Sequence, residues 1–142
     1  MPNEEITHYE SVTTSGYVSF LQRTSADIID MGFGDSYDWP FNFDDEVLIV
    51  KHDNIPVACM VFRWIEWKRR IFLAHTFVLP DYRRQGIYTR MYARLKEIAV
   101  SKKATNIMSG VHVNNKIMQD CSERNGRVRT AIIYEDRGFS DK

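Results

Sequence analysis

Residues 76–92, TFVLPDYRRQGIYTRMY, join a strand-like segment to a helix-like one, and the rest of the chain is interpreted outward from them. Pro80 ends the strand because it removes a backbone donor from the sheet ladder. Arg83, Arg84 and Gly86 then precede a helix, whose first turn offers unpaired N–H groups and the positive end of the helix dipole. Glycine permits close approach to this backbone, and arginine forks suit phosphate. The segment predicts a pyrophosphate site; the alternative is an ordinary loop with solvated arginines.

The segments on both sides of this turn predict one domain over residues 1–142. Hairpins come first and strand–helix–strand units later, so we expect an α/β (α+β) fold with a central mixed sheet flanked by helices. Ser25 is expected to be an N-cap and Gly32 a helix stop. The expected strands are residues 6–12, 46–51, 57–64, 71–79, 107–113 and 128–134; the expected helices are 16–22, 25–31, 87–100 and 114 or 115 to about 124.

The composition of the 142-residue chain is that of a soluble globular domain, with 44% hydrophobic and 27% charged residues. The amino terminus lacks the basic start and apolar run of a secretory signal, and no stretch suits a membrane helix. Cys59 and Cys121 form neither a disulfide framework nor a zinc-site spacing. These features predict a cytoplasmic protein with no metal site and no membrane partner.

Charge is divided unevenly along the chain, although the net charge is zero. Residues 1–62 hold 2 basic and 11 acidic side chains, whereas residues 63–142 hold 17 basic and 8 acidic ones. Opposite signs favour a site with one cationic and one anionic ligand, unless the two halves interleave and simply neutralise each other. A nucleic-acid site at Lys68–Arg70 is disfavoured, because a hairpin tip explains those charges and the acidic half would repel DNA.

Two motifs at the central turn resemble the acetyl-CoA site of the GCN5-related N-acetyltransferase (GNAT) family. Val78–Pro80 (VLP) is similar to the family's V-x-P, and Arg83–Tyr88 (RRQGIY) to its R-x-x-G-x-(small) pattern. A weaker match is Val111, then Asn115, then a helix that closes at Gly126. The resemblance implies the acyl-CoA N-acyltransferase fold. It is shortened at the C-terminus here, because one strand follows the last helix where the family usually has two.

The same resemblance implies acetyl-CoA as co-substrate, with its pantetheine arm between the V-x-P strand and the strand expected at residues 107–113. Tyr88 stands where the family prefers Gly or Ala, and Ser122 where members commonly have a tyrosine that protonates the departing thiolate. The implied contacts are Phe77, Val78, Leu79 and Asn115 for the arm, and Arg83, Arg84, Gln85, Gly86, Ile87, Tyr88 and Thr89 for the pyrophosphate.

Acetyl transfer to an amine requires deprotonation of the amine, polarisation of the thioester carbonyl and departure of the thiolate. His75 is the expected base, since imidazole titrates near neutral pH and family members often carry a carboxylate at this place. A core histidine is the alternative, and His112 is the second choice as base. By resemblance the Val78 N–H would polarise the carbonyl. Ser122 has the position of the acid, which Tyr134 or water could replace.

The acidic and aromatic stretch of residues 33–46 predicts the acceptor site. Carboxylates attract a cationic amine and aromatic faces can hold it, so we expect Asp44, Asp45 and Glu46 to bind the substrate. The predicted acceptor is a polyamine, an aminoglycoside-like amine, or a lysine or N-terminus of a protein. The alternative is a solvated acidic loop whose aromatic side chains fill the core.

The predicted function is acetyl-CoA-dependent transfer of an acetyl group directly to a cationic amine. The alternative is a catalytically weak or inactive GNAT-fold domain that binds acyl-CoA or a partner. The serine at position 122 and the short carboxyl end favour this alternative, and the intact RRQG turn disfavours it. A missing strand also exposes a sheet edge, which leaves a homodimer open. Cys121 is interpreted as a small buried residue rather than a nucleophile.

Overall fold

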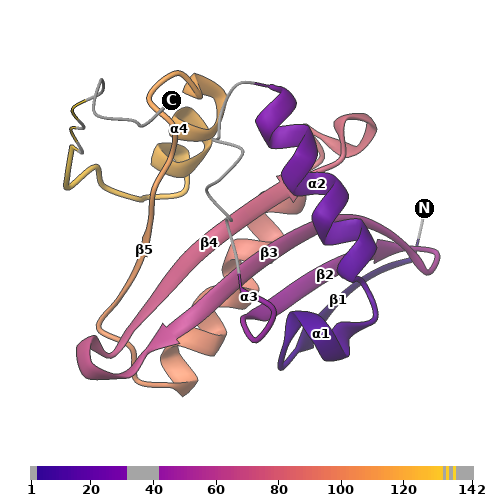
Figure 1. Cartoon of the computed structure of the whole chain (residues 1–142), viewed down its shortest axis with the longest axis horizontal. Helices are drawn as coiled ribbons and strands as arrows, with labels where there is room; N and C mark the ends of the chain where they lie inside the picture. The colour runs from indigo at the N-terminus through magenta and orange to yellow at the C-terminus, as the bar shows by residue number, and fades with distance from the viewer. Residues whose placement is uncertain (1–2, 32–41, 133, 135, 137–142) are drawn as a thin grey trace, which may run out of the picture.

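A five-stranded mixed sheet organises the computed structural model, which describes residues 3–31, 42–132, 134 and 136 (Figure 1). The strand order is β1-β2-β3-β4-β5; neighbours are antiparallel except for the parallel pair β4 and β5. The predicted fold class is therefore confirmed. The strands are β1 (Glu4–Tyr9), β2 (Glu46–His52), β3 (Ile55–Ile65), β4 (Arg70–Val78) and β5 (Asn106–Ser109); the helices are α1 (Val12–Ser15), α2 (Val18–Asp30), α3 (Ile87–Ser101) and α4 (Lys116–Arg124).

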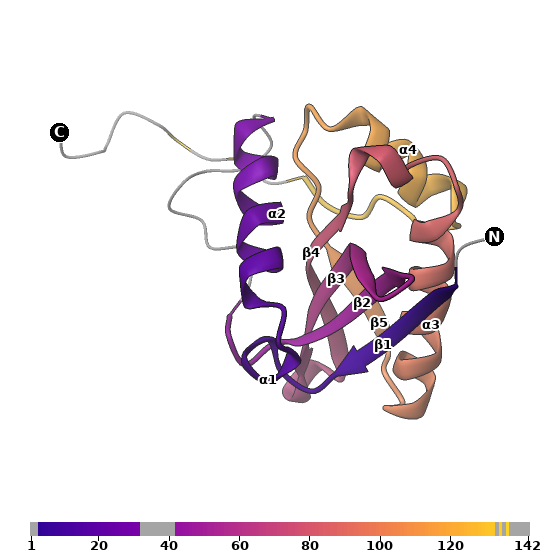
Figure 2. The same cartoon turned by 90° about the vertical axis from the view of Figure 1, so that its right-hand side faces the viewer.

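Helices cover both faces of the sheet, with α2 on one side and α3 on the other (Figure 2). Ile87, Met91 and Leu95 recur at helical spacing and bury one stripe of α3 against the sheet. Side chains alternate between the faces of a strand, so Leu48 packs on the α3 side and Ile49 on the α2 side. Burial on both faces explains why β2 and β3 have nearly continuous apolar sequences. None of the described helices is long and apolar enough to span a bilayer.

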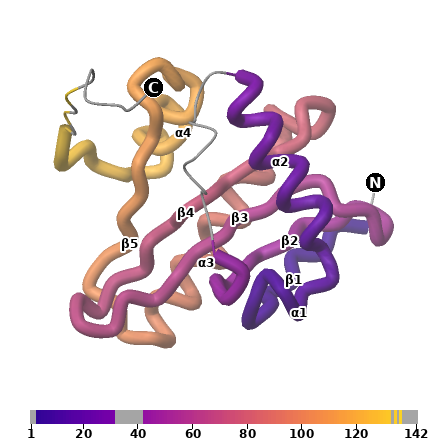
Figure 3. Tube along the Cα trace, in the orientation of Figure 1, coloured from indigo at the N-terminus to yellow at the C-terminus, as the bar shows by residue number. Residues whose placement is uncertain are grey.

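The parallel pair β4 and β5 separates partway along, which Figure 3 shows as two diverging traces. Their pairing ends at Leu73 and Ser109, whereas β4 continues to Val78. A bulge lies at the same level, because Phe62 pairs with Leu73 and Val61 with His75. The extra residue changes which side chains face which helix: Leu73 packs in the α3-side core, and His75 contacts α2. Beyond Leu73 the edge of β4 that faces β5 therefore has no strand beside it in the described part of the chain.

The amino-terminal helices differ from the prediction. One helix, α2, runs through the two expected segments from Val18 to Asp30, and the short α1 precedes it. Ser25 is not an N-cap; it is buried in the middle of α2. The expected first strand begins two residues earlier, at Glu4 instead of Ile6. Gly32 lies outside the described residues. Leu21, Thr24 and Ser25 are the buried residues of α2. They form one buried face that runs across the expected break between the two helices.

The expected last strand, residues 128–134, is wrong in the described part of that segment. Residues 127–132 and 134 have no regular structure, and the Val128 and Tyr134 side chains are 80% and 87% exposed. A strand at residues 128–134 would need a neighbouring strand to pair with. The neighbouring strand β5 is instead bonded by the Arg127 side chain. Its guanidinium donates to the Ile107 carbonyl at 3.3 Å and to Ser109 Oγ at 2.6 Å. The strand before α4 is also shorter than expected, since β5 ends at Ser109.

Candidate active site

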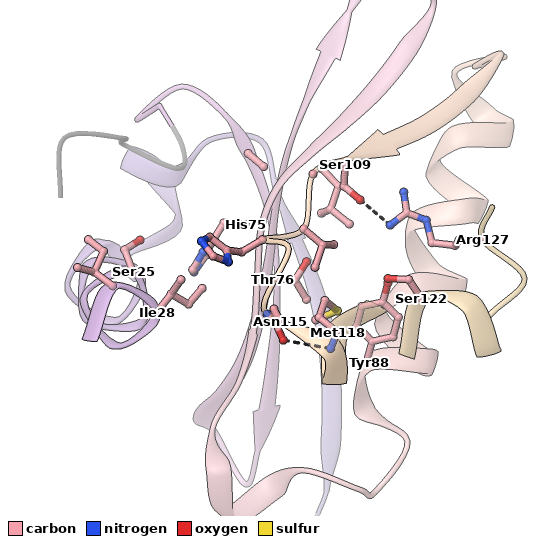
Figure 4. A pocket seen from close by; sticks show the side chains of 16 residues that line it. Ser25, Ile28, His75, Thr76, Tyr88, Ser109, Asn115, Met118, Ser122 and Arg127 are labelled. Atoms are coloured by element: carbon pink, nitrogen blue, oxygen red, sulfur yellow. Dashed lines mark hydrogen bonds between the residues drawn. The ribbon is translucent and has the colours of Figure 1, made fainter. Parts of the chain in front are cut away.

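A cavity of about 270 Å³ opens where β4 and β5 separate (Figure 4). Segments from both sides of the sheet meet there, because the bulge turns His75 towards α2 while α4 lies against the opposite side. The walls come from α2 (Ser25, Ile28, Ile29), β4 (residues 73–76), the first turn of α3 (Tyr88), residues 109–112, and α4 with its flanks (Asn115, Met118, Ser122, Arg127). The structure thus brings together His75, Tyr88, Asn115 and Ser122, which the sequence placed far apart.

The turn before α3 presents a row of backbone amides. Among the described residues, the N–H groups of residues 84–89 donate to no carbonyl or side chain, whereas the Arg90 N–H closes the first helical bond to the Gly86 carbonyl at 3.1 Å. Arg84 and Gly86 both have left-handed backbone conformations, with φ of 63° and 78°. Unpaired amides at the positive end of a helix dipole form an anion site. The geometry therefore suits the phosphate contacts expected at residues 84–89.

The glycine at position 86 is required by two features. Its φ of 78° is a conformation that residues with a Cβ rarely adopt, and a Cβ would lie 2.8 Å from Arg90 Nη1. Arg90 is held at this place by the Gln85 carbonyl, at 2.9 Å, and by Glu4 on β1, at 2.6 Å from Nε and 2.9 Å from Nη2. The Arg90 side chain therefore braces the turn through the Gln85 carbonyl and uses none of the amides of residues 84–89.

Arg83 and Arg84 are not equivalent. The Arg83 side chain folds back onto the end of β4, where Nε donates to the Val78 carbonyl at 2.8 Å and the guanidinium lies 5.2 Å from the centre of the Phe77 ring. Arg84 is exposed and makes no hydrogen bond to any described residue. Arg84 is therefore the cation of the pair that a phosphate can take without breaking an existing contact, whereas Arg83 closes the carbonyl end of β4.

His75 is a buried, neutral imidazole at the edge of the cavity. Its side chain is 5% exposed, and Nε2 lies 2.8 Å from Thr24 Oγ1 on α2. The Thr24 hydroxyl donates its single proton to the Leu21 carbonyl at 2.8 Å. Thr24 Oγ1 can therefore only accept from His75, so His75 Nε2 carries a proton and is the donor. Burial lowers the pKa of His75 to about 4. A base with this pKa is poorly matched to proton removal at neutral pH.

Asn115 begins α4 and also lines the cavity. Its Oδ1 accepts from the Met118 N–H at 3.2 Å, which is the side-chain cap that asparagine commonly provides. This confirms the predicted start of the helix. The neighbouring His112 also borders the cavity, and its Nδ1 accepts from the Asn114 N–H at 3.1 Å. The second-choice base is thus engaged in the turn that leads into α4.

The hydroxyls of Tyr88 and Ser122 meet in the interior of the site. Both side chains are buried, and neither hydroxyl has a hydrogen-bond partner among the described residues. Burial raises the pKa of the Tyr88 phenol, and the proximity of Ser122 and Arg127 opposes part of that rise. Sequence reasoning assigned Tyr88 to the phosphate turn only. The family pattern has a small residue at this position, so the large tyrosine was the signal that the side chain could reach beyond the phosphate turn.

Asp44, Asp45 and Glu46 lie around a second cavity, which shares no described residue with the first. Asp45 is buried and receives two hydrogen bonds from Arg63, at 3.0 and 2.9 Å. Glu46 accepts from His8 Nε2 at 2.9 Å, and Lys102 Nζ lies 3.6 Å away. Asp44 is exposed. The structure therefore engages two of the three expected acceptor carboxylates with cations of the chain itself and separates all three from His75.

Neither cysteine has the features of a nucleophile. Burial raises the pKa of the Cys59 thiol to about 12, and burial also raises the pKa of Cys121, so both thiols stay protonated at neutral pH. The thiolate is the nucleophilic form of cysteine. Across the described residues, no group of three or more His, Cys, Asp or Glu side chains could hold a metal ion.

Solved structures with the same fold are acetyltransferases by their descriptions. An aminoglycoside N-acetyltransferase, AAC(6')-Iy, in complex with CoA superposes with a TM-score of 0.72 at 14% identity, covering 99% of this chain and 97% of that one. An aminoglycoside acetyltransferase, meta-AAC0020, from an uncultured soil metagenomic sample, in complex with sisomicin, gives 0.76 at 11% identity, covering 96% and 97%. The ribosomal-protein-alanine N-acetyltransferase of Brucella melitensis biovar Abortus 2308 gives 0.70 at 14%, covering 96% and 100%.

Sequence comparison leads to the same family. No curated protein sequence matches the chain. The model of the acetyltransferase (GNAT) family matches residues 12–126. These residues include β2 to β5, the turn at Gly86, and the helices α3 and α4 that border the cavity. This span covers most of the 142 residues, and it contains both motifs on which the resemblance was based. The chain therefore belongs to the acetyltransferase (GNAT) family.

Proposed function

We propose that this protein transfers the acetyl group of acetyl-CoA directly to an amine that is cationic in solution. One observation carries the proposal: Tyr88, whose amide belongs to the unpaired set of residues 84–89, lines the same cavity as residues 73–76 of β4, where the pairing with β5 ends. A pyrophosphate site joined to an open strand edge suits a ligand with a diphosphate at one end and amide groups along its arm. Coenzyme A has that form.

The contacts to the coenzyme follow from these free groups. The amides of residues 84–89 and the Arg84 guanidinium hold the pyrophosphate, and the end of β4 at Phe77, Val78 and Leu79 lies along the pantetheine arm. Two backbone groups there are already used, because the Leu79 N–H donates to the Val57 carbonyl and the Val78 carbonyl accepts from Arg83 Nε. Asn115 faces the arm from the start of α4, with its amide nitrogen left over after the helix cap. When bound, acetyl-CoA supplies an acyl group that is activated as a thioester.

The amine must enter the cavity as the neutral base. The cavity-lining residues that the structure describes include no carboxylate, and they include the cation Arg127. An alkyl ammonium has a pKa of about 10.4, so it has to lose a proton before it can attack. Because the pKa of His75 is lowered to about 4, we assign His75 to the wall of the acceptor space and the proton to water. Direct transfer follows from the two protonated thiols.

Two features support a cationic acceptor. Asp27 and Asp30 belong to the same turn of α2 as Ile28 and Ile29, which line the cavity; neither carboxylate lines it, and their charges near its wall would attract a cation. The fold is also shared with enzymes described as aminoglycoside acetyltransferases and with one described as acting on a ribosomal-protein alanine. Both descriptions concern amines. Asp44, Asp45 and Glu46 remain a prediction from the sequence as acceptor contacts.

Turnover on a panel of amines tests this function. The purified chain is incubated with acetyl-CoA and polyamines, aminoglycosides or peptides with free amino termini, while release of free thiol is recorded and the acetylated product is identified by mass spectrometry. We expect thiol release that depends on the amine. Stabilisation by acetyl-CoA in a thermal melt without turnover on any amine would instead support a binding module.

A further inference from the structure

We propose that the Tyr88 hydroxyl, in the first turn of α3, gives the proton to the departing sulfur of coenzyme A, a task that the sequence assigned to Ser122. This inference rests on the proposed function, because it assigns a residue to the acetyl transfer itself. It arises from one observation: the Tyr88 hydroxyl is a buried polar group with no partner in the described part of the chain, and its side chain lines the cavity.

The position of the phenol is well defined. The Tyr88 side chain is 92% buried in the α3-side core, and its ring stacks on that of Tyr92 at 5.8 Å with only 5° between the planes. Tyr92 lies one helical turn further along α3, so the helix itself fixes the stack. Figure 4 shows the Tyr88 side chain beside Ser122 and Met118, on the side of the cavity opposite His75 and Ser25. The Tyr88 side chain therefore borders the cavity from a rigid support, with its hydroxyl buried beside Ser122.

An unpartnered buried hydroxyl is rare because it loses its hydrogen bonds to water without replacement. Tyr88 and Ser122 both have such a hydroxyl, and both line the same cavity, which indicates that a ligand atom completes them. A phenol is a much stronger acid than an alkyl alcohol, and its pKa is closer to that of a thiol. Tyr88 is therefore the better proton donor of the two, and Ser122 is suited to a hydrogen bond with the phenol oxygen.

The groups that face Tyr88 suit both of its protonation states. Burial raises the pKa of the phenol, so the donor proton is present at neutral pH. The Arg127 guanidinium, from the segment after α4, is anchored on Ser109 Oγ and the Ile107 carbonyl and favours the charged phenolate. Cys121, the other titratable neighbour, disfavours the phenolate. The described salt bridges give Arg127 no carboxylate partner.

Every bond and proton in the step is accounted for. The amine nitrogen forms a bond to the acyl carbon, the carbon–sulfur bond breaks, and its electron pair stays on sulfur. The proton on Tyr88 Oη moves to sulfur, which gives the free thiol. The nitrogen loses one proton to water, and the phenolate regains one from water. An amine and a thioester thus become an amide and a thiol, with no further reactant.

The variant Y88F tests the proposal, with Y92F as matched control. Y92F removes the same hydroxyl from the stacked ring one turn away, which does not line the cavity. The first readout is independent of turnover: the ultraviolet absorbance of the thiolate is titrated with pH for coenzyme A bound to each protein. Since hydrogen bonding favours the charged form, we expect Y88F to raise the pKa of the bound thiol by about one unit and Y92F to leave it unchanged.

The second readout separates kcat from KM. We expect Y88F to lower kcat about 100-fold, in the range of general acid catalysis, with the KM for acetyl-CoA changed less than about twofold. Y88F with the kcat and bound-thiol pKa of the wild type would overturn the inference. Wild-type protein that binds coenzyme A without turnover would overturn the proposed function and the transfer step, and the thiol titration would still decide whether the Tyr88 hydroxyl contacts the sulfur. Wild-type protein that does not bind coenzyme A would overturn both.

Discussion

Thr24 on α2 accepts a hydrogen bond from His75 on β4 across 2.8 Å, and this contact joins the helix to the strand at the edge of the cavity. The hydroxyl of Thr24 already donates to the Leu21 carbonyl, so it accepts the imidazole proton. A charged imidazole would place its charge in a site where the side chain is buried from water. The contact therefore fixes Nε2 as the protonated nitrogen, while burial lowers the pKa of His75 and keeps the ring neutral.

The first prediction concerns stability against pH. The folded pKa of His75 is about 4 and the unfolded one 6.5, so the unfolded chain binds more protons between these values. The free energy of unfolding should therefore fall as the pH falls from 6.5 through 4, by about 3 kcal/mol at the end of this window. Urea unfolding at several pH values, with wild type and His75→Gln, measures this. The difference between the two proteins should change with pH; a constant difference would contradict the burial of a neutral His75.

The second prediction compares two glycines with a left-handed backbone: Gly86, at the N-cap of α3, and Gly16, at the C-cap of α1. Gly86→Ala should destabilise the protein by more than Gly16→Ala. Both substitutions impose a Cβ at a φ near 80°, which costs about 1 kcal/mol. Only Gly86 has a neighbour within 4 Å of that Cβ, namely Arg90 Nη1 at 2.8 Å. Thermal melts of both variants measure the difference, and equal losses would mean that Arg90 moves aside without cost.

The third prediction separates two adjacent carboxylates. Asp45→Asn should lose about 2 kcal/mol of stability, because it removes the charge that partners Arg63 in a largely buried pair. Asp44→Asn, at the exposed neighbour, should change stability by less than about 0.5 kcal/mol. Chemical denaturation compares them. A similar loss in both variants would refute a structural role specific to Asp45, and a raised KM for the amine in Asp44→Asn would support the acceptor role predicted from the sequence.

Sequence patterns were sufficient where local signals agree. The stripe of Ile87, Met91 and Leu95 behind Gly86 predicted α3 to within one residue. A cap at Asn114 or Asn115 was predicted for α4, and the structure has it at Asn115. They failed at Ser25, where a good capping residue is buried within a continuous helix. They also failed at residues 128–134, where β propensity cannot show whether a partner strand exists.

The site was predictable only in part, because its chemistry depends on contacts between distant segments. The predicted phosphate turn is contiguous in sequence, so residues 83–89 could be proposed together as one group. The bulge that leaves one extra residue between Leu73 and His75 has no sequence signature, yet it decides which helix His75 faces. The meeting of Tyr88 with Ser122, from two different helices, follows from the packing of α4 beside α3 and could not be deduced from spacing.

The most direct test of the account is calorimetric titration of the wild-type protein with coenzyme A and, separately, with pantetheine, which lacks the pyrophosphate. If the amides of residues 84–89 hold that group, coenzyme A should bind at one site and at least about 100-fold more tightly than pantetheine, since several charge-assisted hydrogen bonds are involved. Gly86→Ala should remove most of this advantage and leave pantetheine binding unchanged. No heat with coenzyme A, or equal affinity for the two ligands, would contradict the account.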